Sequence, residues 1–201
     1  AAVYRFADCD FQQALAWVRA ASPEKKKELA AECLARMDRR VTPLRELEHV
    51  TYTFDSVMDQ GAYFEVKRHR MMTQTPQRLT CDLGYAVPRL MEEAGFRERY
   101  EEAMEKAAQA YRTLAAFDPD LASYLAPNGY NRRLLMSLNL REAFHFCELR
   151  SAANAHFSVR RIAARMAEMI QEVHPTLAAF MRLPEELDWR QIEAENFSRV
   201  V

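Results

Sequence analysis

The sequence predicts an α+β fold that is mainly helical and contains a small antiparallel sheet. The chain has only 4 glycines among 201 residues, and 49% of its residues are apolar. Most segments space these apolar residues three and four apart, as amphipathic helices do, and only two short segments, 50–54 and 132–138, read as strands. This length and composition predict one domain over residues 1–201, with a peripheral tail from about residue 183 to residue 201.

The first half of the chain is expected to contain three helices and one strand. Ser22-Pro23-Glu24 has the pattern of a helix start, because Ser is a favoured N-cap and Pro is favoured at the first helical position. The run VTYTF at residues 50–54 alternates β-branched and aromatic side chains, as a strand does. In order, the expected elements are a helix over Phe11–Ala20, a helix from Ser22 to about Met37, a strand over Val50–Phe54 and a helix over Asp59–Lys67.

The second half is expected to contain further helices and a second strand. Pro76 and Gly84 interrupt the segment Thr73–Val87, which therefore predicts an extended loop. The turn PNG at residues 127–129 precedes the second strand, and Asn139 has a side chain suited to a helix N-cap. In order, the expected elements are one long amphipathic helix over Pro88–Phe117, a short helix from Asp118, a strand over Arg132–Leu138, a helix from Asn139 to about Ser151 and a helix over Phe157–Val173.

Charge and composition argue against several classes of function. The chain has 28 basic and 29 acidic residues, whereas a general nucleic-acid binder should be strongly basic. No apolar run approaches the roughly 18 residues of a membrane span, and no signal peptide is visible. We therefore expect a cytoplasmic protein with neither nucleic-acid nor membrane partners. The first residue is Ala rather than Met, which suggests a piece of a longer chain.

The cysteines do not predict a metal site. They lie far apart, without a CxxC pair or another metal-ligand spacing, at Cys9, Cys33, Cys81 and Cys147. We expect free thiols in a reducing compartment.

Arg68-His69-Arg70 is the most informative short motif. It follows the helix expected over Asp59–Lys67, so three consecutive donors stand at a helix end. Each Arg offers a planar fork suited to two phosphate oxygens, and the His can donate a hydrogen bond or stack on a ring. The motif therefore favours an anionic ligand. A solvated basic edge and an RNA-binding edge are the alternatives.

The helix expected from Asn139 predicts a second group of donors. Arg141 and His145 are four residues apart and share one helical face. If the apolar residues Leu138, Phe144 and Leu149 are buried, a polar set points at one cleft. That set is Asn139, Arg141, His145 and Arg150. A polar helix edge with a histidine satisfied in the core is the alternative.

Taken in order, these motifs resemble the flavin-dependent thymidylate synthases. That family carries RHR-x2-S-x4-S-x-R and, on a later helix, N-x-R-x3-N-x3-LR. This chain has RHRMMT at residues 68–73 and NLREAFHFCELR at residues 139–150, in the same order and with nearly the same spacing. Glu48-His49 precedes both motifs, and Pro127 falls where the family has the Pro of an L-P element. The resemblance runs from about residue 28 to residue 173.

The resemblance implies a homotetramer that holds FAD between subunits. In the family, NADPH reduces the flavin, methylenetetrahydrofolate supplies the one-carbon unit, and dUMP becomes dTMP. Arg150 matches the arginine that grips and polarises the nucleotide, so it is the candidate catalytic residue, and Glu65 and Arg68 are expected to contact the nucleotide as well. The positions that match the flavin pocket are His49, Arg68, His69, Arg70, Thr73, Asn139, Arg141 and His145.

The departures from the family fall mainly on the nucleotide side. Glu65 stands where many members have Gln, and Arg78-Leu79-Thr80 replaces the expected S-x-R. Ser123 replaces another nucleotide-binding arginine. Two readings follow. Either the chain is a working or substrate-shifted enzyme in which Arg78 and Arg150 replace the lost contacts, or it is a non-catalytic copy, like the second domain of a tandem member, that serves assembly or regulation.

Overall fold

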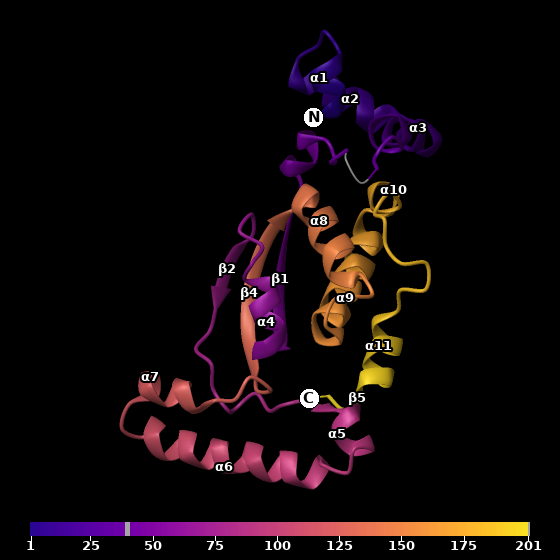
Figure 1. Cartoon of the computed structure of the whole chain (residues 1–201). Helices are drawn as coiled ribbons and strands as arrows, with labels where there is room; N and C mark the ends of the chain where they lie inside the picture. Colours follow the sequence, from indigo (N-terminus) through magenta and orange to yellow (C-terminus); the bar gives the residue numbers. More distant parts are fainter. Residues whose placement is uncertain (39–40, 201) are drawn as a thin grey trace.

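The computed structural model describes residues 1–38 and 41–200 and confirms the α+β class. Its centre is a three-stranded antiparallel sheet with the order β1-β4-β2. The strands are β1 (Thr51–Asp59), β4 (Asn131–Asn139) and β2 (Thr73–Pro76). The helices α4 (Gln60–Val66), α8 (Leu140–Ser151) and α9 (Phe157–Val173) pack against this sheet to form the main core (Figure 1).

Both predicted strands form, and each is longer than predicted. β1 and β4 pair over nine residues, from Thr51 opposite Asn139 to Asp59 opposite Asn131. The full length of β1 was not evident from the sequence, because polar residues such as Asp55 interrupt the apolar pattern. These residues occupy the exposed face of the sheet. Alternate residues of β4, including Leu134 and Met136, are fully buried. The sheet therefore has one apolar face and one polar face.

The segment Thr73–Val87 is not a continuous loop, so that prediction was wrong. Its first four residues form β2, which pairs with β4 from Thr73 opposite Ser137 to Pro76 opposite Leu134. Pro76 is compatible with this arrangement because it closes a short strand at the sheet edge, where a missing N–H is tolerated.

The prediction of a single helix over Pro88–Phe117 was also wrong, because the helix is interrupted at Gly95. The segment forms α5 (Arg89–Glu93) and α6 (Arg97–Ala115). Gly95 has φ of 72°, a left-handed conformation that glycine adopts without steric cost and that ends α5. The short helix predicted from Asp118 forms as α7 (Pro119–Ala122).

The helix α6 belongs to a second, smaller core at one end of the molecule. Met104 and Tyr111 from α6 pack with Cys81 and Tyr130. The opposite end carries the N-terminal helices (Figure 1). These are α1 (Ala2–Phe6), α2 (Phe11–Ala20), α3 (Pro23–Leu34) and the 3-10 helix η1 (Arg45–His49). Ser22 caps α3 as predicted, and the helix ends three residues before Met37.

The helices that carry the later motifs form where they were predicted. Asn139 caps α8 by accepting a hydrogen bond from the N–H of Glu142 at 2.9 Å. Leu138 and Phe144 are buried as expected. Leu149 was predicted to be buried and is not, since 46% of it is exposed. It lies on the outer face of α8, away from the sheet.

The C-terminal tail packs along α9. It contains α10 (Pro175–Ala178), α11 (Trp189–Asn196) and β5 (Phe197–Arg199), which pairs with β3 (Val87–Pro88). Ile192 and Phe197 are buried against the rest of the chain. Within the described residues, no helix is long and apolar enough to cross a membrane.

Candidate functional site

His69 lies at the centre of a buried polar network between the 66–73 turn and α8. Only 5% of the residue is exposed. Its Nδ1 atom lies 2.9 Å from Oε1 of Glu142, and its Nε2 atom accepts a hydrogen bond from Nε of Arg150 at 2.9 Å. The ring packs edge-on against Phe146, with centroids 4.8 Å apart. Glu142, Phe146 and Arg150 are spaced four residues apart, so one face of α8 supplies all three contacts.

The geometry assigns the proton of the imidazole. Arginine only donates, so Nε2 of His69 must be the acceptor. The ring proton then lies on Nδ1 and is donated to the Glu142 carboxylate. This arrangement fixes the orientation of His69, as a carboxylate partner commonly does for histidine. His69 therefore faces the helix in this structure, and it is not a free donor at the surface.

Glu65 closes the network on the side of α4. Its Oε2 atom accepts a short hydrogen bond from Nη1 of Arg150. Its Oε1 atom lies 3.6 Å from Nη2 of Arg68. Glu65 thus neutralises the arginine that was expected to grip the nucleotide and also contacts Arg68. The two cations and the carboxylate form a compact group at the C-terminal end of α4.

A pocket of about 200 Å³ lies beside this network, at the first turns of α8. Arg141 forms part of its wall and is held in place by three groups. It donates to the Pro43 carbonyl at 2.9 Å, to Glu48 at 2.8 Å and to Thr42 at 3.3 Å. The hydrogen bonds to Arg45 and then Arg141 lower the pKa of the Glu48 carboxyl. The residues that line the pocket are Thr42, Pro43, Glu48, Met71, Asn139, Arg141, Glu142 and His145.

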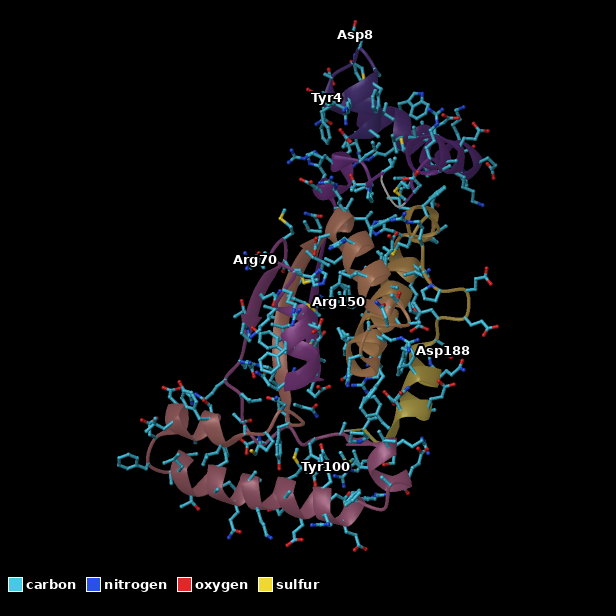
Figure 2. All side chains as sticks on the ribbon, in the orientation of Figure 1. Tyr4, Asp8, Arg70, Tyr100, Arg150 and Asp188 are labelled. Carbon is cyan, nitrogen blue, oxygen red and sulfur yellow. The ribbon has the colours of Figure 1, made fainter. Side chains whose placement is uncertain are left out.

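The single cleft predicted for Asn139, Arg141, His145 and Arg150 divides into two regions. The first three residues line the pocket, as predicted, but Arg150 does not. Arg150 is nine residues beyond Arg141, which places it roughly 13 Å further along the helix axis. It lies between the sheet and the helices, whereas Arg70 lies at the outer tip of the turn before β2 (Figure 2). Glu142 connects the regions, since it lines the pocket and binds His69.

The remaining predicted site residues lie around or away from this centre. Arg70 and Thr73 are exposed, Arg70 in the turn before β2 and Thr73 at the first position of that strand, on either side of Met71, which lines the pocket. His49 lines a different, apolar cavity of about 530 Å³ beneath the N-terminal helices. Arg78 lies beyond the other end of β2 and pairs with Asp120 of α7 at 2.8 Å. The structure therefore does not bring Arg78 together with Arg150.

Five residues that line the pocket were not singled out as site residues from the sequence, namely Thr42, Pro43, Glu48, Met71 and Glu142. Glu142 follows the cap by three positions, and its spacing to Arg150 is a signal that could have identified it. Glu48 was noted only as the neighbour of His49, and Met71 only as part of the motif. Within the described residues, no group of three or more His, Cys, Asp or Glu side chains is placed to hold a metal ion.

The fold and the site together define an α+β domain in which a small polar pocket adjoins a buried network of His69, Glu142 and Arg150. Residues 2–176 match the family described as thymidylate synthase complementing protein, and the chain belongs to that family. The resemblance identified from the motifs is confirmed.

Individual relatives fall into two groups. A UPF0159 protein of Chlamydia muridarum is 38% identical over 170 residues, which cover 84% of this chain and 32% of that protein. A UPF0159 protein of Thermoplasma acidophilum is 35% identical over 156 residues, which cover 77% of this chain and 31% of that protein. A flavin-dependent thymidylate synthase of Saccharolobus solfataricus is 33% identical over 139 residues, which cover 65% of this chain and 54% of that protein. The chain spans about a third of the length of the two UPF0159 relatives.

Proposed function

We propose that this chain is a flavin-binding domain of the thymidylate synthase type and acts within a larger assembly. The proposed reaction is the methylation of dUMP to dTMP, with FAD as cofactor and with methylenetetrahydrofolate and NADPH as co-substrates. One observation carries this proposal. The network of His69, Glu142 and Arg150 adjoins a pocket that Asn139, Arg141 and His145 help to line.

The residues present fit one wall of a flavin site. Arg70 is exposed, and among the described residues it makes no ion pair or hydrogen bond, so its guanidinium is available for a diphosphate. His145 is exposed at the pocket and can stack or donate. The pocket of about 200 Å³ is smaller than the roughly 300–1,000 Å³ of typical ligand sites. A second chain or domain would therefore have to supply the opposite wall.

The side chains of this chain would position and polarise the reactants. When bound, the reduced flavin would supply the electrons for the methylation. Arg141 holds the 42–48 segment against α8 and so shapes the pocket floor. The bond to His69 fixes the side chain of Arg150, which can donate toward a pyrimidine carbonyl once Glu65 releases it. Such preorganised donors stabilise charge that develops on an oxygen during reaction.

We further propose that the chain assembles with copies of itself, most simply as a homotetramer, or with a sister domain of a tandem protein. Leu135, on the exposed face of the sheet, is 47% exposed in the isolated chain. An apolar residue on an uncovered sheet face is suited to burial in an interface.

A second candidate function is a non-catalytic domain that serves assembly or regulation. The observation that favours it is that carboxylates pair with the arginines that were expected to bind the nucleotide. Glu65 occupies Arg150 and contacts Arg68, and Asp120 occupies Arg78. A nucleotide phosphate would have to displace these carboxylates or bind beside them, and both arrangements cost free energy.

Flavin binding and turnover distinguish the two candidates. Absorbance near 450 nm should reveal a flavin in the purified chain, with and without added FAD, and loss of the C5 hydrogen of dUMP should report turnover. We expect Arg70→Ala to weaken FAD binding about tenfold, as loss of a charge-assisted contact does. Arg19→Ala on α2 is the matched control. A folded chain that has assembled and still stays colourless with excess FAD would favour the second candidate.

A further inference from the structure

A groove runs between β1 and α9, outside the site described above. Its volume is about 590 Å³. One wall is made by five consecutive residues of β1, Thr53–Val57, and the other by α9 and α11. Consecutive residues of a strand point to opposite faces of a sheet. A groove that contacts all five must therefore run along the edge of β1.

The main chain along this edge is free to bind. Among the described residues, β1 is the last strand of the sheet and pairs only with β4. The N–H of Leu140 donates to the carbonyl of Val50, so Val50 and every second residue after it in β1 are hydrogen-bonded to β4. The N–H and C=O groups of the residues between them, Thr53, Asp55 and Val57, therefore point away from β4. Among the residues described, none bonds to these main-chain groups. Three donors and three acceptors therefore line the edge.

The wall formed by α9 combines apolar side chains with two arginines, Arg161 and Arg165. Ile162, Met166 and Met169 line it. Arg161 donates to Glu193 at 2.6 Å, yet its buried Nε atom has no hydrogen-bond partner. Arg165 is exposed and makes no ion pair within the described part of the chain.

The two carboxylates that line the groove are already paired. Asp55 accepts from Arg133 at 2.8 Å, and Glu193 accepts from Arg161. Arg165 therefore remains as the cation of the groove that makes no ion pair among the described residues, and Glu168 on the same helix interacts with it only at longer range. Its guanidinium lies 5.1 Å from the ring centroid of Trp189. Trp189 and Glu193 belong to α11, beyond the residues 2–176 that match the family. This part of the groove is built by a segment outside the family match.

We propose that the groove binds an extended acidic peptide segment of a partner protein, which pairs with β1 as an additional strand. Peptides add to exposed sheet edges in this way, with main-chain bonds supplying affinity and pockets for alternate side chains supplying specificity. From Thr53 to Val57 the edge extends roughly 13 Å, a length that a strand can pair along and a compact ligand cannot. An apolar side chain would enter beside Met166, and a carboxylate would meet Arg165.

Fluorescence of Trp189 provides a direct test that involves no flavin. The chain has two tryptophans, so Trp17→Phe leaves Trp189 as the only one. The probe is the peptide acetyl-VEVEV-amide. We expect it to change the Trp189 emission, and we expect VKVKV and a version of VEVEV N-methylated at alternate amides to bind at least about tenfold more weakly. Arg165→Ala should weaken VEVEV binding by a similar factor.

A protein variant tests the edge itself. Val57→Pro removes an N–H that points away from β4, so no bond of the sheet is lost. Val57→Pro should weaken binding of the VEVEV peptide, whereas Val57→Ala, which keeps the N–H, should not. If Val57→Pro does not fold, the N-methylated peptide still tests the same bond. The proposal is overturned if the N-methylated peptide binds as tightly as VEVEV, or if VEVEV does not bind at millimolar concentration. It is also overturned if the chain forms a dimer that Arg165→Ala abolishes, because a second copy of the chain would then be the occupant.

Discussion

Arg150 donates its Nε–H to Nε2 of His69, a residue 81 positions earlier in the chain, at 2.9 Å. The contact joins the turn after α4 to the last turns of α8, and it forces the proton of His69 onto Nδ1, next to Glu142. One histidine thus connects the two motifs on which the family resemblance rests. Three predictions concern the site and the assembly of the chain, and one concerns the buried thiol of Cys147.

The first prediction concerns the buried bond between His69 and Glu142. Glu142→Gln replaces a charge-assisted bond with a neutral one in a buried position, and we expect the free energy of unfolding to fall by about 1 kcal/mol, the difference between the two kinds of bond. Urea denaturation measures it. Nitrogen NMR of the wild-type chain should show His69 protonated on Nδ1. Glu102→Gln, which alters an exposed pair with Lys106, should cost much less, because water screens an exposed ion pair. Equal losses in both variants would contradict the proposed network.

The second prediction concerns the carboxylate of Glu65. Glu65→Gln keeps the shape of the side chain but removes the charge that neutralises Arg150. We expect dUMP to bind about tenfold more tightly to this variant than to the wild-type chain, since a phosphate no longer competes with a carboxylate. Calorimetry measures the two constants. Glu48→Gln, beside Arg141, should change dUMP affinity much less. If Glu65→Gln binds dUMP no better, Glu65 does not obstruct the nucleotide side.

The third prediction concerns alkaline pH. Burial raises the pKa of the Cys147 thiol to about 12, against 9.0 when exposed. The unfolded chain therefore loses this proton first, so the contribution of the thiol is present below pH 9 and is lost as the pH rises toward 12. Within this window the contribution of Cys147 to the free energy of unfolding should fall by about 1.4 kcal/mol per pH unit, in addition to the contributions of other buried groups. Cys147→Ser should reduce that slope in urea melts at successive pH values. An unchanged slope would exclude Cys147 as the cause.

The fourth prediction concerns assembly through the exposed sheet face. Leu135 lies between Asp55 of β1 and Thr75 of β2. Leu135→Glu should leave the folded chain within about 0.5 kcal/mol of the wild type, because the position is largely exposed. It should shift the mass distribution in light scattering toward smaller species, since a charge would be buried in an apolar interface. A wild-type chain that is already monomeric at micromolar concentration would contradict assembly with copies of itself.

The sequence predicted most helices and both main strands because their signals are local. Ser22 and Asn139 cap their helices through bonds to residues three positions away, and the apolar spacing of α9 is regular throughout. β2 was missed because a four-residue polar strand forms only when β4 lies beside it. The break at Gly95 was missed because a glycine within a helical pattern can either continue or end the helix.

The sequence by itself determined the fold class, the family and the set of donors in the two motifs, since residue type and order carry this information. Only the tertiary structure decided which donors are free. It buried His69 between Glu142 and Arg150, and it placed Glu65 against Arg150. These partners are 73 to 85 residues apart in the chain. Hydrogen bonds act over about 3 Å, so no local pattern could reveal them before α4 and α8 were packed on the same sheet.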